Sequence, residues 1–440
     1  MTVAVETLEK LQRRVTLTLS PQAVSAEVDK RLKKLARTVK ADGFRPGKVP
    51  MSVVNQRFGY SVQYEVLNDQ LGAAFDQTAR EAGLRVAGAP DIAPVEGQKA
   101  EDQAAGMQFH ATFEVYPEIT LGDLSAVAVD KVSAEVNDGA IDRTVGILRA
   151  QRRTFSQRAA SVATEAGDRV TIDFEGKIDG EPFAGGAAQD FQFIVGEGQM
   201  LEQFDQAVRG MKVGESKTFP LQFPEDYHGK DVAGKEADFL VTVKKLEQQH
   251  LPEVDDAFAQ SLNVADGTVD GLRADIRKNL EREVKFRVLA RNKAAAMDAL
   301  LKVVDFDLPS ALVKGEAQRM GEQMRADLKA RGMKDADKMP IPEDAFTEQA
   351  ERRVRLGLAV GELVRQHSLQ AKPEQLRAHL DEIAQSYEKP AEVVQWYLGD
   401  RQRMGEVEAV VLENNVAQWI LSQVQVTDKA VGFEELMQQA

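Results

Sequence analysis

The first 115 residues switch between two periodicities of apolar side chains. Residues 11–19 place apolar side chains at alternate positions, with Arg13 as the polar exception, which predicts a half-buried strand. Ser20 and Pro21 then supply a helix N-cap and a first-turn proline. The whole pattern predicts an α+β domain with a strand over 11–19, a helix to about residue 39, a helix over 50–82 and extended segments over 84–95 and 107–115.

A connector and a compact sheet are expected next. Residues 116–150 join an extended piece to a helical pattern, and residues 165–245 turn to strand patterns rich in glycine and aromatic residues. A two-residue Asp-Gly turn between strands is typical of a β-hairpin. We expect a small antiparallel sheet with strands at 169–174 and 238–246, a turn at Asp179-Gly180 and a short helix near 201–209.

Residues 248–440 carry helical periodicity with almost no strand pattern. Apolar side chains recur every four residues from Leu272 to Val288, which places them on one helix face. Pro309 and Pro373 are expected to begin further helices. The sequence therefore predicts an all-helical domain, with several helices long enough to act as arms.

Charge is distributed unevenly along the chain. The net charge is −14, so nucleic-acid binding by the whole molecule is not expected. Residues 1–60 nevertheless hold 12 Lys and Arg against 5 Asp and Glu, a balance of +7 that leaves −21 for the remainder. A basic head on an acidic body predicts that the head docks on an anionic partner.

Composition argues against several kinds of site. The chain has no cysteine, which rules out disulfides and thiolate metal ligands. Its N-terminus lacks a signal-peptide pattern and no stretch approaches a membrane-spanning run, so a cytosolic protein is expected. None of the 5 histidines stands three or four residues from another, and no G-x-S-x-G occurs. Metal, nucleophilic and acid–base catalysis therefore have no support.

Residues 41–50, ADGFRPGKVP, place a large aromatic ring among turn residues and bases. Phe44 lies between Gly43 and Gly47, with Arg45 and Lys48 alongside. The glycines are one residue too close for a Walker A loop, so nucleotide binding is not expected. Two interpretations stay open: an ordinary turn with Phe44 folded inward, or a loop that presents Phe44 to a partner.

Apolar side chains concentrate in two further places. The methionines of the helical region either fill its core or provide an adaptable surface that accepts many sequences. Either all the aromatic rings near the predicted sheet pack in a core, or some line a concave apolar pocket. The methionines are Met297, Met320, Met324, Met333 and Met339, and the rings are Phe174, Phe183, Phe191, Phe193, Phe204, Tyr227 and Phe239.

The loop GFRPGKVP at 43–50 resembles the ribosome-binding signature of the trigger factor family, bacterial chaperones that meet nascent chains at the tunnel exit. The order of basic head, connector, sheet and helical tail extends the resemblance over essentially the whole chain. Pro46 stands where the family usually has a basic residue, which stiffens the loop and removes one ionic contact. The resemblance implies that Phe44 and Arg45 contact ribosomal protein and rRNA of the large subunit, within a docking loop made of Gly43, Phe44, Arg45, Pro46, Gly47 and Lys48.

Three segments resemble an FKBP-type peptidyl-prolyl isomerase: VTIDFEGKIDGEPFAGG at 170–186, FIVGEGQMLEQFDQAVRGMKVGE at 193–215 and FPEDYHG at 223–229. Two positions depart from that family, because Ala184 replaces an acidic residue and Glu202-Gln203 replaces a common Pro-Gly. The resemblance implies that the pocket is formed by Phe174, Phe183, Phe191, Met200, Leu201, Phe204, Tyr227 and Phe239.

Together the resemblances imply a multidomain α+β protein. Its expected parts are a ribosome-binding α+β domain (1–115), a connector that packs with the C-terminal domain (116–150), an FKBP-like antiparallel sheet with a short helix (151–247) and an all-α chaperone domain with helical arms (248–440).

The implied protein is an ATP-independent, cytoplasmic and partly ribosome-bound chaperone that holds nascent or unfolded polypeptides and isomerises X-Pro bonds. It needs no cofactor or metal and has no membrane partner, and the resemblance also allows a weak homodimer off the ribosome. Two alternatives stay open: a holdase whose FKBP-like module is structural, and a nucleic-acid-binding protein that uses the basic head.

Overall fold

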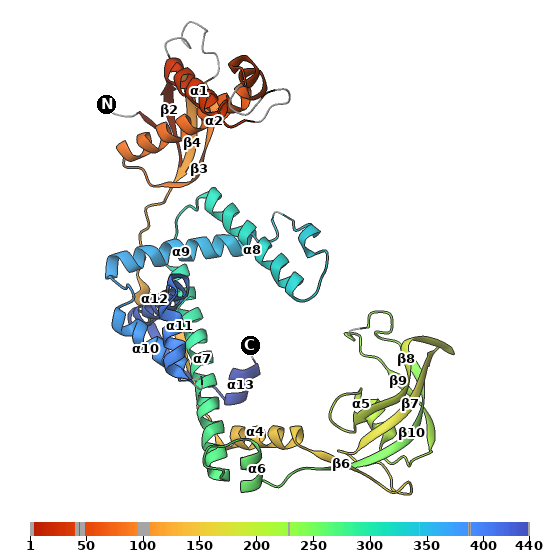
Figure 1. Cartoon of the computed structure of the whole chain (residues 1–440). Coiled ribbons are helices and arrows are strands. Elements are labelled where there is room, and N and C mark those ends of the chain that lie inside the picture. Colours follow the sequence, from red (N-terminus) through yellow and green to blue (C-terminus); the bar gives the residue numbers. More distant parts are fainter. Residues whose placement is uncertain are drawn as a thin grey trace. The chain divides into compact units, whose positions relative to one another are not determined.

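Contacts group the chain into two compact units, residues 1–132 with 289–429 and residues 133–288 with 430–440. Figure 1 labels the elements of both units. The four expected domain ranges stay a prediction. A computed structural model describes residues 4–39, 44, 49–95, 106–227, 229–342, 344–385, 387 and 389–438, with Asp337 described by its main chain alone.

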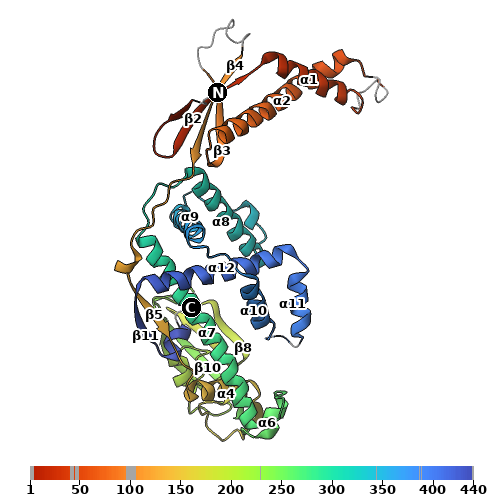
Figure 2. The same cartoon turned by 90° about the vertical axis from the view of Figure 1, so that its left-hand side faces the viewer.

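The N-terminal part of the first unit is an antiparallel sheet packed against two helices (Figure 2). Its elements are β1 (Val5–Thr7), β2 (Gln12–Leu19), α1 (Pro21–Leu35), α2 (Met51–Glu81), β3 (Val86–Pro94) and β4 (Met107–Val115). The strand order is β1-β2-β4-β3. Val15, Leu17 and Leu19 alternate along β2 and are buried, as the sequence pattern predicts. Phe75 from α2 meets Phe113 from β4 edge-on, with ring centroids 5.0 Å apart.

α1 begins as predicted but ends earlier. The Ser20 hydroxyl accepts a hydrogen bond from the Ala23 N–H at 3.4 Å, and Pro21 occupies the first turn. The helix stops at Leu35 rather than near residue 39. Beyond it, the Thr38 N–H donates to the carbonyl of Leu35, three residues back, and such bonds tighten the last turn.

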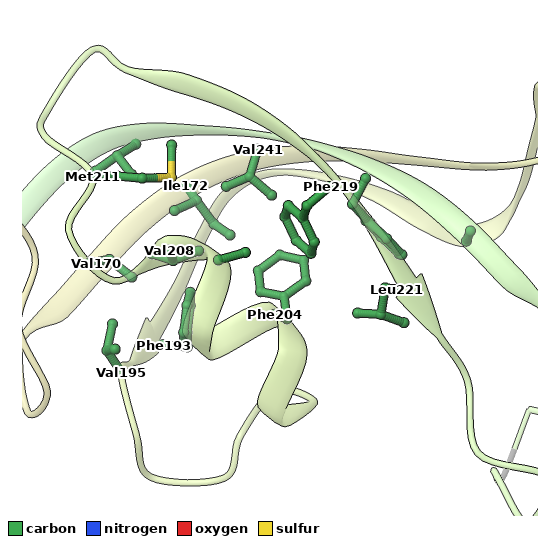
Figure 3. Packing of buried hydrophobic residues seen from close by; sticks show 14 of the residues in the cluster. Val170, Ile172, Phe193, Val195, Phe204, Val208, Met211, Phe219, Leu221 and Val241 are labelled. Carbon is green, nitrogen blue, oxygen red and sulfur yellow. The ribbon is translucent and has the colours of Figure 1, made fainter.

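The second unit is built around an antiparallel sheet with one short helix, as the sequence predicts. Its elements are β6 (Thr154–Gln157), β7 (Arg169–Ile178), β8 (Glu181–Ile194), α5 (Glu202–Val208), β9 (Ser216–Gln222) and β10 (Glu236–His250). The order is β6-β10-β7-β8, with β9 paired to β10. Phe204 of α5 is 1% exposed and lies edge-on to Phe219 of β9, with ring centroids 5.4 Å apart (Figure 3).

The predicted Asp-Gly turn joins β7 to β8. Asp179 and Gly180 both have positive φ angles, 53° and 86°. Positive φ at both central residues defines a type I′ turn, whose twist matches that of the flanking strands. This hairpin holds together the two strands that carry much of the site described below.

Helices complete the second unit. They are α4 (Asp138–Gln151), α6 (Asp256–Ser261), the first turns of α7 (Val269–Lys302) and α13 (Phe433–Gln438). Ile141 and Val145 of α4 pack with Leu272 and Ile276 of α7, so the predicted apolar face of α7 is confirmed.

The helical part of the first unit has its own core, which includes Leu300, Leu363, Val416 and Ile420. Its elements are the later turns of α7, the 3₁₀ turns η1 (Leu124–Ala126) and η2 (Ala336–Lys338), α8 (Ser310–Ala330), α9 (Thr347–His367), α10 (Pro373–Ala384), α11 (Pro390–Leu398) and α12 (Arg401–Gln423). Among the described residues, no helix combines the length and the apolar character needed to cross a membrane.

One strand lies in the region that the sequence predicts to be helical. β11 (Gln425–Ala430) pairs with β5 (Ala128–Ser133), and the Gln425 N–H donates to the Val127 carbonyl at 2.9 Å. All residues of β11 are exposed, so no alternation of apolar side chains indicates the strand. Its pairing depends on a partner far away in the sequence, which a local pattern does not reveal.

Candidate functional site

A bulge in β8 brings Phe183 onto the face of the sheet. The register of β7 with β8 shifts beside Gly176, which lies opposite residues 183–186. The Phe183 ring rests against the backbone here, because a Cβ at Gly186 would come within 2.8 Å of the ring and one at Gly176 within 3.1 Å. The position of this ring therefore depends on glycine at both places.

Three rings from three elements converge beside Phe183. Phe174 of β7 lies 5.7 Å from Phe204 of α5 and 6.1 Å from Phe239 of β10, measured between ring centroids. Phe204 and Phe239 are 5.6 Å apart, and Phe183 meets Phe239 edge-on at 6.1 Å. Phe204 and Phe239 are buried and form what we call the floor of the site. Phe174 and Phe183 are partly exposed and belong to its accessible rim.

A second bulge sets Phe191 at the edge of these rings. Asp173 Oδ1 accepts a hydrogen bond from the Asp190 N–H at 2.7 Å, next to a shift in the β7–β8 register. Phe191 is 37% exposed and lies edge-on to Phe174 at 5.7 Å. Lys244 pairs with both Asp190 and Asp173, and the hydrogen bond that it donates to Asp190 raises the pKa of Lys244. A network of charges thus braces the bulge that holds Phe191.

Two loops supply the remaining expected residues. Met200 and Leu201, between β8 and α5, are partly buried against the same core. Tyr227 joins through Phe223, whose ring centroid lies 4.9 Å from that of Tyr227 and 6.0 Å from that of Phe183. The structure therefore brings all the expected pocket residues together in what we call the ring cluster: Phe174, Phe183, Phe191, Met200, Leu201, Phe204, Tyr227 and Phe239, with Phe223.

Two further rings, which the sequence does not single out, belong with this group. Phe219 stacks on Phe239 with centroids 6.2 Å apart, and Phe223 links Tyr227 to Phe183. The missed signal is the alternation of Phe219, Leu221 and Phe223 along β9 and just past its end, all three of which are buried. Period-two alternation predicts that these side chains share one face of the sheet.

The ring cluster provides an apolar surface of aromatic and aliphatic side chains, with the Tyr227 hydroxyl as its polar group. Such a surface binds an apolar ring by contact and by edge-to-face packing. Among the described residues, no three His, Asp or Glu side chains are placed to hold a metal ion. This arrangement can bind an apolar polypeptide segment, and it can favour one conformation of that segment over another.

The basic N-terminal loop is described at one of its candidate positions. Phe44 is 42% exposed, so its ring is accessible to a partner. The other candidates, Gly43, Arg45, Pro46, Gly47 and Lys48, lie outside the described residues.

Basic side chains are exposed on the helix that leads to this loop. Lys33 and Lys34 of α1 and Arg37 just beyond it are exposed. Arg31 instead donates to Asp69 Oδ2 at 2.7 Å, and this hydrogen bond raises the pKa of Arg31. The positive charge predicted for the head is thus partly presented to solvent and partly used to join α1 to α2.

An antiparallel sheet with one short helix, whose rings converge over a buried floor, fits the class of FKBP-type peptidyl-prolyl isomerases. The family model for FKBP-type peptidyl-prolyl cis-trans isomerase matches residues 161–244. Those for bacterial trigger factor protein and for its C-terminus match residues 1–148 and 268–422.

Two curated relatives agree with these matches over the whole chain. The chain is 67% identical to the trigger factor of Acidovorax sp. (strain JS42) over 440 residues, 100% of both chains. It is 67% identical to that of Methylibium petroleiphilum over 437 residues, 99% of this chain and 100% of the relative. A solved structure of a trigger factor chaperone aligns with 96% of this chain and 100% of its own, with a TM-score of 0.45 and 17% identity. The chain belongs to the trigger factor family, chaperones with an FKBP-type peptidyl-prolyl isomerase domain.

Proposed function

We propose that this chain is an ATP-independent, cytoplasmic chaperone that docks at the ribosomal tunnel exit, holds nascent or unfolded polypeptides and isomerises X-Pro bonds at the ring cluster. The observation that carries the isomerase site is the convergence of Phe174, Phe204 and Phe239 beside the partly exposed Phe183. These rings come from strands and a helix rather than from free loops, so the site is pre-organised.

The chemistry of the reaction suits such a site. Rotation about an X-Pro bond must overcome the partial double-bond character of the amide, a barrier of about 18–20 kcal/mol. The twisted amide has lost resonance and is less charge-separated than the planar one, so an apolar surface favours it relative to water. Acceleration then comes from binding the twisted state more tightly than the planar state. In the proposed mode the buried floor excludes water while Phe183 and Phe191 at the rim contact the proline ring.

Docking through the loop at 43–48 is supported by the accessible ring of Phe44 and by the exposed bases of the preceding helix. Phe44 would enter an apolar patch of ribosomal protein at the large-subunit exit, and Arg45 and Lys48 would pair with rRNA phosphates. Lys33 and Lys34 add charge that offsets the missing base at Pro46. Binding of this kind weakens as salt rises, because phosphate contacts release counterions.

Holding of unfolded segments is supported by exposed methionines on the helical part. Met320, Met324, Leu328 and Phe346 line a groove of about 310 Å³ along α8. Met324, and also Met333 and Met339 nearby in the sequence, are exposed. Flexible thioether side chains adapt to many partners, and burial of apolar area yields roughly 25 cal/mol per Å². Such a surface binds clients weakly and without sequence preference.

Ribosome docking is tested by co-sedimentation with 70S ribosomes. The wild type is compared with Phe44→Ala/Arg45→Ala and with a matched control, Lys285→Ala/Phe286→Ala, which removes a basic–aromatic pair from α7. We expect the wild type and the control to sediment and the loop variant to stay in the supernatant. Equal sedimentation of all three proteins would contradict docking by this loop.

A second candidate function is a holdase whose isomerase module is structural. It is favoured by Ala184, which leaves the bulge beside Phe183 without an acid, and by Gln203, whose side chain ties α5 to β9 by accepting from the Gln222 N–H at 2.9 Å. A protease-coupled assay of a proline peptide separates the two functions. Acceleration that saturates with peptide concentration supports an active site, and a rate equal to the spontaneous one supports the structural role.

A further inference from the structure

Asp205 ties the short helix of the isomerase module to the segment before it. This aspartate follows Phe204 in α5, and its Oδ2 accepts a hydrogen bond from the Gly196 N–H at 3.0 Å. The residue is 5% exposed. One side chain of α5 thus forms part of the buried floor of the ring cluster, and the next holds the backbone of a neighbouring loop.

The loop it holds, residues 195–201, carries two members of the ring cluster, Met200 and Leu201. Gly196 and Gly198 both have positive φ angles, 89° and 71°, so the loop follows a backbone path that favours glycine. Glycine at two such positions makes the loop costly to order, because glycine loses the most conformational freedom on folding. The hydrogen bond at Gly196 therefore restrains the loop at one of its two glycines with positive φ.

Open space beside the loop makes the hydrogen bond between Gly196 and Asp205 important for the position of the loop. A cavity of about 330 Å³ borders Gly196, Gly198, Met200, Asp205 and Arg209, with Glu202 and Gln206 completing its lining. The loop has open space on this side. It is also held by a hydrogen bond from the Ile194 N–H to Gln199 Oε1 at 2.9 Å and by the Arg153–Glu197 ion pair, neither of which fixes the Gly196 backbone. Loss of the Asp205 hydrogen bond would let Met200 move away from the rings.

Burial of this aspartate is costly for stability. Its Oδ1 is buried and has no hydrogen-bond partner within the described part of the chain. Burial raises the pKa of Asp205, against the opposing effects of the Gly196 hydrogen bond and the Arg209 charge. A buried polar atom without a partner is destabilising, whereas an apolar side chain of similar size at this position would carry no such penalty. The hydrogen bond that Oδ2 accepts from the Gly196 N–H explains why a carboxylate suits this position.

We propose that Asp205 is a positioning residue of the isomerase, which fixes the 195–201 loop so that Met200 and Leu201 stay against the rings whose floor Phe204 provides. The inference rests on the proposed function of the ring cluster. It predicts that the loop loosens without Asp205 while the sheet does not.

The test compares Asp205→Ala, Asp205→Asn and a matched control, Glu202→Ala, in the full chain. Glu202 lines the same cavity from the same helix, but its carboxylate accepts from the Gln206 side chain instead of from Gly196. Asn at 205 keeps an oxygen that accepts from the Gly196 N–H. The readouts are KM and kcat for a proline peptide, and hydrogen–deuterium exchange of peptides that cover the 195–201 loop and strands β7 and β10.

In Asp205→Ala we expect faster exchange in the loop with unchanged exchange in β7 and β10, and about a tenfold lower kcat/KM carried by KM, since small misplacements of positioning groups have effects of this order or larger. Asp205→Asn should recover most of both readouts, and Glu202→Ala should match the wild type. Unchanged loop exchange and KM in Asp205→Ala would overturn the inference, as would equal acceleration of exchange throughout the module in both Asp205 variants. A wild type without isomerase activity would instead contradict the proposed function. The exchange measurement would then still test the hydrogen bond from Gly196 to Asp205, and unchanged loop exchange in Asp205→Ala would contradict its restraining role.

Discussion

Gly176 of β7 lies directly opposite Phe239 of β10, and the ring of Phe239 fills the space where a side chain at 176 would lie. A Cβ at Gly176 would come within 2.6 Å of that ring. Phe239 has no room to retreat, because Phe204, Phe219 and Phe183 surround it at centroid distances of 5.6, 6.2 and 6.1 Å. The absence of a side chain at one position thus sets the place of a ring in the floor of the candidate site.

Gly176→Ala is therefore expected to destabilise the isomerase module by about 1–3 kcal/mol through overpacking. It should also lower kcat/KM for a proline peptide, since Phe239 and Phe183 are displaced together. Gly146→Ala is the control, because Gly146 is an exposed helical position where an added Cβ would crowd no other element within the described part of the chain. The control should be neutral or more stable by up to about 1 kcal/mol, as for glycine replaced by alanine in a helix. Urea-dependent hydrogen exchange of β7 and β10 measures the first effect, and equal stability of the two variants would contradict it.

Asn292 is expected to be among the most sensitive polar positions of the first unit. This buried side chain of α7 accepts from the Val132 N–H at 2.7 Å and donates to the Val132 carbonyl at 2.9 Å. Asn292→Ala leaves both groups of Val132 without this partner, which should cost at least about 2 kcal/mol. The unfolding free energy is measured in urea by tryptophan fluorescence, since Trp419 packs against the same core as this part of α7.

The matched control for Asn292 lies on the same helix. Asn279 is exposed and accepts a hydrogen bond from Arg282 within the helix. Asn279→Ala should change the unfolding free energy by less than about 0.5 kcal/mol, as exposed substitutions usually do. Equal losses of unfolding free energy in the two asparagine variants would contradict the predicted contribution of the Asn292–Val132 hydrogen bonds to stability.

Glu247 should make the stability of the isomerase module depend on pH on the acid side. Burial by itself would raise the pKa of Glu247, but hydrogen bonds donated by Lys245 and Arg169, each 2.9 Å long, outweigh it and hold that pKa below its usual value. A pKa lowered in the folded state contributes stability that is present above the unfolded value of about 4.3 and is lost as pH falls through the folded value. Glu247→Gln should therefore be less stable at pH 7 and show a shallower loss below about pH 4. Parallel pH profiles for the two proteins, measured by urea unfolding, would argue against the assignment.

Much of the candidate site could be predicted because its members carry two kinds of signal. Phe174 and Phe239 lie in segments that the sequence predicts to be strands, and short motifs around Phe183 and Phe204 resemble a known family, from which Phe191 also follows. The roles of Gly176 and Gly186 could not be predicted in the same way. They follow from the register shift between β7 and β8, which depends on how many residues each strand contributes at the bulge.

The remaining differences also come from long-range contacts. β11 is exposed along its length and becomes a strand only by pairing with β5. Asn292 looks like an ordinary polar residue of a helix until Val132 is placed beside it. Asp205 looks like one of many surface acids, although the structure buries it. A local pattern predicts which face of an element is apolar, but not which distant backbone group a polar side chain meets.

The isomerase site is tested most directly by two alanine substitutions of similar exposure in the same sheet. Phe191, in the ring cluster, is 37% exposed, and Leu240 is 45% exposed. Leu240 follows Phe239 in β10 and therefore points to the other face of the sheet. The measurement is kcat/KM of the full chain for a proline peptide. We predict a loss of roughly tenfold for Phe191→Ala, because an aromatic contact contributes about 0.5–1.5 kcal/mol beyond its buried area, and no change for Leu240→Ala. Full activity in Phe191→Ala, or equal losses in the two variants, would contradict catalysis at the ring cluster.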